Sequence, residues 1–177
     1  DCLKKIEGVE TCFCCLAIQG KPNNFDNLKT LQEYTNKFLK QENEKFTPQQ
    51  AAILLLLNLL KDNDPINERV ILSLYKKRKY YIEDSKITPI IQENLFKFLN
   101  SSKDTQLYPI IINLMCDISL YNKLCISCLK GEYDYYRPFF NPKNHEISAA
   151  TARLILILSN NKIINPDHVA SILLIEK

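Results

Sequence analysis

The scarcity of glycine constrains this chain more than any other feature of its sequence. The 177 residues include only three glycines, Gly8, Gly20 and Gly131. Hairpin-rich β folds and phosphate-binding loops need glycine where the backbone takes positive φ angles. The composition therefore argues against β-sandwiches, P-loops and dinucleotide-binding folds, and it favours an all-α chain.

Helix starts are marked by a capping residue followed by proline. Such a residue accepts a backbone N–H of the first turn, and proline at the first helical position loses no hydrogen bond. The pairs are Thr47-Pro48, Asp64-Pro65, Thr88-Pro89 and Asn165-Pro166. With these starts and the apolar periodicity we predict about nine helices. They cover residues 2–18, 26–41, 48–60, 65–80, 89–99, 106–119, 120–130, 146–158 and 166–175.

The predicted helix starts recur at a nearly fixed spacing. Thr47 and Thr88 lie about 41 residues apart, as do Asp64 and Thr105, and Thr105 and Glu146, which is close to the period of armadillo and HEAT repeats. The pattern predicts one helical domain over residues 1–177, with capping helices in 1–46 and about three repeats in 47–177.

Short sequence similarities support this spacing. The segment from Leu57 to Leu60, followed by Asp64 and 67–69, resembles the end of the third helix of an armadillo repeat and the start of the next helix. Residues 112–115, with Ser119 and 122–123, resemble it a second time. We therefore expect short antiparallel helices stacked as a small armadillo-like α-solenoid. The usual glycine pair between repeats is missing, which leaves HEAT-like or irregular helical packing as the alternative.

The armadillo resemblance implies a protein that binds an extended peptide along a concave groove. Asparagine side chains hold the peptide backbone in that family, and Asn58 and Asn113 stand where such residues would fall. The alternative is that both are ordinary helix-surface or turn residues. The chain has no tryptophan, so we do not predict binding of nuclear-import signals.

The cysteines favour a reducing compartment, and the sequence contains no apolar run of membrane-spanning length. Seven is an odd number, and several cysteines stand among apolar residues. We therefore predict small core residues in an intracellular protein, cytoplasmic or nuclear. The alternative is a secreted domain. Two C-x-x-C pairs, 12–15 and 125–128, lie in predicted helices without knuckle turns, so we predict no zinc site and no cofactor.

No catalytic constellation is recognisable. The only histidines are His145 and His168, and neither has a nucleophile and an orienting group at a supporting spacing. We read both as structural or solvent-exposed residues. The chain is therefore predicted not to be an enzyme.

Two segments are candidates for binding. The first is basic, Lys76, Lys77, Arg78 and Lys79, and it precedes Tyr80 and Tyr81. Consecutive cations contact phosphates and tyrosines stack on bases, so this segment could bind nucleic acid. The alternative is a basic C-terminal turn that complements the helix dipole.

The second segment is aromatic and lies in the longest predicted loop. Aromatic residues and arginine dominate interface hot spots, so the segment is a candidate docking loop for a protein partner. The alternative is that its aromatics fold onto the core. Its candidate binding residues are Tyr133, Tyr135, Tyr136, Arg137, Phe139 and Phe140.

Taken together, the sequence predicts a non-enzymatic adaptor that binds a peptide or helix of a partner protein. Two alternatives remain open. One is a nucleic-acid-binding helical domain that uses residues 76–79, although the formal net charge of +3 is mild for that class. The other is a secreted or pathogen-derived helical effector.

Overall fold

The computed structural model describes residues 45–61, 64–122, 125–126, 129, 135–140, 143–165 and 167, together with Glu33 and Asn36. These residues form five α-helices joined by short 3₁₀ turns, and the described part of the chain contains no strand. The all-α prediction is confirmed for this part. The predicted helix 2–18 lies outside the described residues, and only Glu33, Asn36 and Asp167, all helical, represent 26–41 and 166–175.

The chain divides into two compact units, residues 1–81 and 82–177. The described helices of the first unit are α3 (Pro48–Leu57) and α4 (Asn67–Lys77), and α4 continues into a 3₁₀ turn at Arg78–Tyr80. Helix α3 begins as predicted, because Thr47 and Gln50 form a capping box. Thr47 Oγ1 accepts from Gln50 N at 3.2 Å, and Gln50 Oε1 accepts from Thr47 N at 2.9 Å.

Helix α4 starts later than predicted. Asp64 does not cap it from the position before Pro65. Its carboxylate instead accepts from Ile66 N at 3.0 Å inside a tight turn, and the N-cap of α4 is Ile66. We attribute the later start to Asn67, whose buried side chain forms two hydrogen bonds with the backbone of Lys61. Asn67 Oδ1 accepts from Lys61 N at 3.1 Å, and Asn67 Nδ2 donates to Lys61 O at 2.6 Å.

This clamp gives a first prediction. Asn67→Ala removes both hydrogen bonds from a buried position, and we expect it to lower the free energy of unfolding of the first unit by about 2 kcal/mol. Urea denaturation of the full chain, followed by hydrogen exchange at the amides of 64–74, measures the change. Asn94→Ala is the matched control, because Asn94 is only half-buried and bonds one carbonyl of its own helix. Equal stability of the two variants would contradict the proposed clamp.

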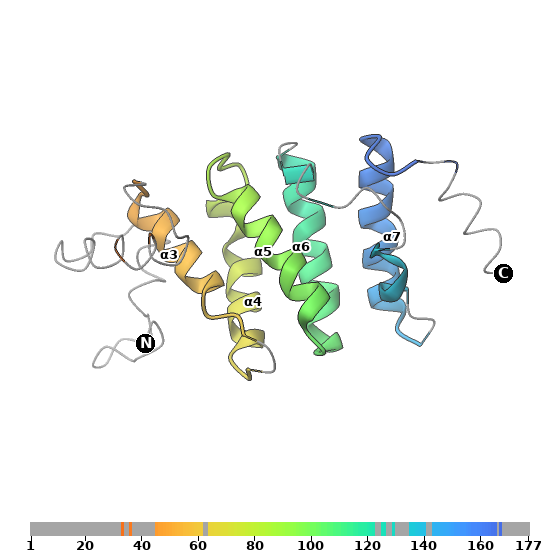
Figure 1. Ribbon diagram of the computed structural model, residues 1–177, viewed down its shortest axis with the longest axis horizontal. Coiled ribbons are helices and arrows are strands. Elements are labelled where there is room, and N and C mark those ends of the chain that lie inside the picture. Colours follow the sequence, from red (N-terminus) through yellow and green to blue (C-terminus); the bar gives the residue numbers. More distant parts are fainter. Residues whose placement is uncertain are drawn as a thin grey trace. The chain divides into compact units, whose positions relative to one another are not determined.

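The second unit contains α5 (Thr88–Ser101), α6 (Tyr108–Tyr121) and α7 (His145–Asn160), with 3₁₀ turns at Thr105–Leu107 and Arg137–Phe139. Helix α5 lies beside α6, and α6 lies beside α7 (Figure 1). Gln92, early in α5, donates to the hydroxyl of Ser119, late in α6, so these two helices run antiparallel.

Helices α6 and α7 run in the same direction. Tyr108, the first residue of α6, makes an edge-to-face contact with Phe139, which lies shortly before the start of α7, at 5.5 Å between ring centroids. The beginnings of the two helices are therefore at the same end. The antiparallel pairing predicted for neighbours thus describes α5 and α6, whereas the long connection before α7 brings the chain back for a parallel neighbour.

The prediction that one helix ends at Ser119 and another begins at Leu120 is wrong. Ser119 lies inside α6, where its buried hydroxyl accepts from Gln92 Nε2 at 2.9 Å, and α6 continues to Tyr121. The backbone turns extended at Asn122, with ψ of 99°. Of the separate helix predicted over 120–130, the described residues 125–126 form a 3₁₀ turn and Leu129 a bend, so no α-helix is seen there.

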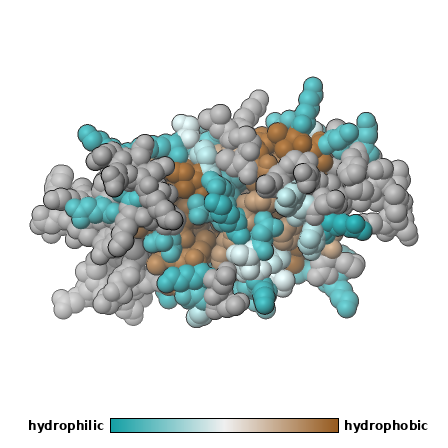
Figure 2. Space-filling model, in the orientation of Figure 1, coloured by the Kyte–Doolittle hydropathy of each residue, from teal (hydrophilic) through white to brown (hydrophobic). Residues whose placement is uncertain are grey.

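The core of the second unit is made by apolar side chains from all three helices and from the segment before α7. Leu95 of α5, Ile111 and Met115 of α6 and Leu158 of α7 are fully buried. In the space-filling view, apolar surface lies among hydrophilic residues over the described helices (Figure 2). Close packing of this kind holds the outward side chains of α6 and α7 on a fixed frame.

Candidate functional site

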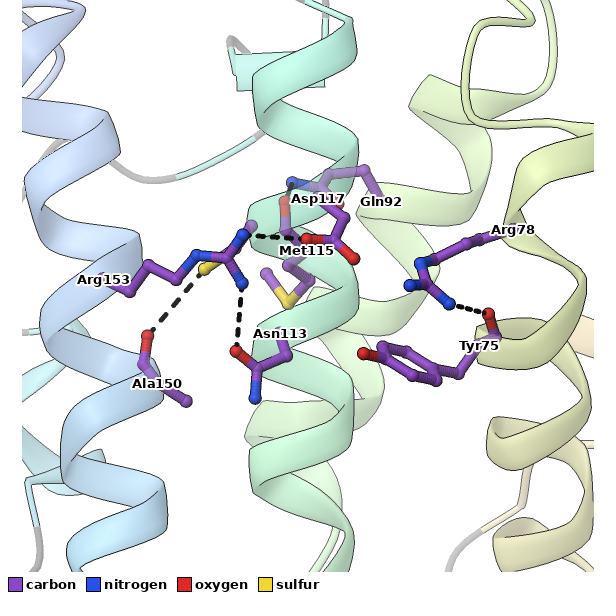
Figure 3. A network of polar contacts seen from close by, with 9 residues as sticks. Tyr75, Arg78, Gln92, Asn113, Met115, Asp117, Ala150 and Arg153 are labelled. Carbon is purple, nitrogen blue, oxygen red and sulfur yellow. Dashed lines mark hydrogen bonds and ion pairs between the residues drawn. The ribbon is translucent and has the colours of Figure 1, made fainter.

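The principal candidate site is a polar contact between α6 and α7. Arg153 of α7 reaches across to α6, where Nη2 donates to Asp117 Oδ1 at 2.9 Å and Nη1 donates to Asn113 Oδ1 at 3.3 Å (Figure 3). The two acceptors stand four residues apart, on one face of α6. The Arg153 side chain remains 44% exposed. The guanidinium is therefore fixed by two contacts and is still open to solvent.

Large apolar side chains lie on the same helix faces. Leu120 and Tyr121 follow Asp117 by one turn of α6, and they are 56% and 65% exposed. Leu156 follows Arg153 by one turn of α7 and is 61% exposed. Because the helices are parallel neighbours, these side chains lie toward the same end. We call Asn113, Asp117, Leu120, Tyr121, Arg153 and Leu156 the α6–α7 face.

The thiol of Cys116 lies buried beneath this face and has low reactivity. Cys116 is fully buried and its Sγ donates to Ala150 O at 3.8 Å. Burial raises the pKa of Cys116 to about 12, Arg153 lowers it by a smaller amount, and Asp117 raises it. A thiol held protonated in this way is a poor nucleophile. The face therefore offers contacts for recognition, and Cys116 is a packing residue.

The packing behind the α6–α7 face includes a buried polar side chain that is only partly hydrogen-bonded among the described residues. The side chain of Gln92 is buried between α5 and α6, and its Nε2 donates to Met115 O at 3.2 Å as well as to Ser119. Its Oε1 has no hydrogen-bond partner among the described residues. Gln92 therefore links α5 to the late part of α6, the part that carries Leu120 and Tyr121.

The predicted docking loop divides into buried and exposed side chains. Tyr136 is fully buried with its ring 6.1 Å from that of Phe96, and Phe139 is 5% exposed against Tyr108. Tyr135 and Arg137 are exposed, Phe140 is half-buried, and Tyr133 lies outside the described residues. Two of the six predicted contact residues thus belong to the core, and docking by the exposed ones stays a prediction.

The predicted basic segment lies at the end of α4. Lys76 and Lys79 are exposed, whereas Lys77 and Arg78 are half-buried. Arg78 turns back onto its own helix, with Nη1 donating to Tyr75 O at 2.8 Å and Cζ 4.1 Å from the Tyr75 ring centroid. Lys79 Nζ lies 4.9 Å from the ring centroid of Tyr80. The four consecutive cations therefore do not form one row.

The two predicted peptide-binding asparagines have different settings. Asn58 is the exposed C-cap of α3 in the first unit. Asn113 is half-buried in α6 and accepts from Arg153 in the second unit. Only Asn113 belongs to the α6–α7 face.

The other chemical candidates give no site in the described part of the chain. His145 is exposed as the first residue of α7, and Cys125 is buried, while His168 and Cys12, Cys15 and Cys128 lie outside the described residues. No group of histidine, cysteine and acidic residues among the described positions could hold a metal ion. The helices that can be described include none both long and apolar enough to cross a bilayer.

Sequence reasoning missed Arg153 and Asp117. The two residues are far apart in the chain, and each alone is an ordinary charge on a helix. A signal was present in the periodicity, because Asp117 and Tyr121 recur at helical spacing on α6, as Arg153 and Leu156 do on α7.

Comparison with known proteins yields no match: no family model, no curated protein and no solved structure is significantly similar to this chain.

Proposed function

We propose that this chain is a non-enzymatic protein-interaction module whose α6–α7 face binds a peptide or helix of a partner protein. The observation that carries the proposal is the exposure of Leu120, Tyr121 and Leu156 on the helix faces that carry Asp117 and Arg153. Single exposed apolar residues are normal on protein surfaces, but a group of them beside arginine and tyrosine has the composition of an interface hot spot.

The rigidity of the face supports recognition. Binding costs free energy when mobile side chains must be immobilised. Arg153 is already held by Asn113 and Asp117, and both parallel helices are anchored in the core through residues such as Met115 and Leu158. Arginine also has five N–H donors, so a guanidinium that uses two nitrogens on α6 can still donate to a partner.

The polar residues of the α6–α7 face, Asn113 and Arg153, can bind the backbone of a partner peptide as well as its side chains. Asn113 uses its Oδ1 to accept from Arg153, which leaves its amide nitrogen as the donor for a carbonyl of the partner. This is the role that the armadillo resemblance gives to the residue.

An armadillo-like stacking of the helices is part of the same proposal. Helices α4 and α6 begin at Asn67 and Tyr108, about 41 residues apart, within the period of such repeats. We also propose an intracellular setting, because Cys116 is a free thiol.

Selection of peptides from a random display library against the full chain tests this function. We expect enriched peptides to bind Leu156→Asp and Arg153→Glu at least about tenfold more weakly than the original chain, because loss of a hot-spot side chain costs about 2 kcal/mol or more. Lys97→Glu on α5 is the control and should leave binding unchanged, since Lys97 is exposed and pairs with Glu93 of its own helix through a surface bridge. Circular dichroism verifies that each variant is folded. Peptides that bind all variants equally would refute the α6–α7 face as the site.

A further inference from the structure

The exposed face of α4 and of the turn that follows it carries a row of three basic residues. Only two of them belong to the consecutive cations at 76–79. Arg69, Lys76 and Lys79 are all exposed, and they follow one another at seven and three residues. Seven residues are two helical turns, and three residues are one turn of the 3₁₀ segment, so the three side chains share a face. Half-buried Ser73 lies between the first two. We call Arg69, Lys76, Lys79 and the adjoining Tyr80 the α4 row.

The acidic residues along the α4 segment lie at its beginning, away from Lys76 and Lys79. Within 45–61 and 64–81, the acidic residues are Asp64 and Glu68, and both lie at or before the first turn of α4. Asp64 is engaged by the backbone N–H of Ile66. Asp84, shortly after the row in sequence, accepts from the backbone of Lys86 and Ile87. From Arg69 to Lys79 the sequence contains no acidic residue, so none stands between the cations along the helix.

Helix-dipole compensation does not account for the whole row. A cation stabilises the C-terminal turn of a helix, which fits Lys76 and Arg78. Arg69 lies near the N-terminus of α4, where the same dipole disfavours a positive charge. Its alignment with Lys76 and Lys79 therefore points to a ligand with several negative charges in a line.

We propose that the α4 row binds the backbone of a single-stranded nucleic acid. From Arg69 to Lys79 the row spans about 15 Å at 1.5 Å per helical residue, a length that covers about four phosphates of a strand stacked at 3.4 Å. Tyr80 is 37% exposed at the end of the row, with Lys79 over its ring. An exposed tyrosine beside phosphate-binding cations is a stacking platform for a base. The α4 row belongs to the first unit and the α6–α7 face to the second, and they share no residue, so each can be tested without the other.

Fluorescence anisotropy of the full chain with a labelled twelve-nucleotide oligo(dT) tests the proposal. Three phosphate contacts on a single strand predict that affinity falls about 20-fold between 50 and 200 mM KCl. The double variant Arg69→Gln, Lys76→Gln removes two contacts, which we expect to lower the slope of log K against log salt by about 1.4. Tyr80→Ala should weaken binding about tenfold, whereas Tyr80→Phe should retain it.

The control is Lys97→Gln with Lys103→Gln, which removes the same number of charges from exposed positions outside the row. We expect its affinity for oligo(dT) to stay within about twofold of the original value, since cations that contact no phosphate release no counterions on binding. No binding at 50 mM KCl, or equal losses in the two double variants, would overturn the proposal. So would equal affinity for poly-glutamate of the same charge, because the ligand would then be an acidic polypeptide.

Discussion

Replacing Tyr136 by alanine is expected to lower the free energy of unfolding by about 3–5 kcal/mol, the usual loss when a large aromatic side chain is truncated inside a core. Tyr136 is completely buried and its ring packs beside Phe96 of α5. The truncation leaves a cavity between α5 and the segment that precedes α7. For a chain of this size the melting temperature should fall by about 10 °C. Thermal denaturation followed by circular dichroism measures it.

The neighbouring tyrosine is the matched control. Tyr135 is 39% exposed, so Tyr135→Ala should change the free energy of unfolding by no more than about 0.5 kcal/mol. If both variants lose the same stability, Tyr136 is not the anchor that its burial indicates. The pair also separates folding from docking, because Tyr135 and Arg137 can be replaced in a folded chain to ask whether their exposed side chains contact a partner.

Local signals predicted the helices well where one short motif decides the backbone. The capping box of Thr47 and Gln50 is complete within four residues, and α3 starts where it indicates. At Asp64-Pro65 the same kind of motif misplaced the start of α4, because Asn67 reaches back to Lys61. That choice between two competing hydrogen-bonded turns depends on residues on both sides of the proline.

Tertiary contacts decided the other differences. The sequence prediction ended a helix at Ser119. In the structure the Ser119 hydroxyl accepts a hydrogen bond from Gln92 of α5, and α6 continues past this residue. The aromatic run at 135–140 gave no indication of which rings turn inward, since this depends on contacts with Phe96 and Tyr108. Local periodicity can place an aromatic residue on a face, but it cannot name the element that covers that face.

The α6–α7 face shows the same limit for function. Asn113 was a candidate through the armadillo resemblance, whereas Arg153 was not, although the two side chains are hydrogen-bonded. Their pairing needs α7 to lie parallel to α6, and the length of the connection between these helices allows that direction. Sequence spacing indicated which residues share a face of one helix, but it gave no information on which residues of different helices pair.

Cys116 is expected to react with iodoacetamide about 1,000-fold more slowly in the folded chain than in urea at pH 8. The thiolate is the reactive form, and burial raises the pKa of Cys116 from 9.0 to about 12, which lowers the thiolate fraction by about that factor. Burial beneath α7 excludes the reagent as well. Peptide mass spectrometry after timed alkylation measures Cys116 separately from the other cysteines.

The same pKa shift fixes how the stability of the fold depends on pH. The folded state keeps the Cys116 proton that the unfolded state loses above about pH 9, so Cys116 contributes its full stability below pH 9 and loses it progressively as the pH rises toward 12. Cys116→Ala removes this titration and should flatten the fall in urea midpoint between pH 8 and pH 10 relative to the original chain. Rapid alkylation of folded Cys116, or an unchanged pH dependence in the variant, would show that α7 does not seal this thiol. Since Arg153 lies directly over the same junction, either result would also count against a fixed α6–α7 face.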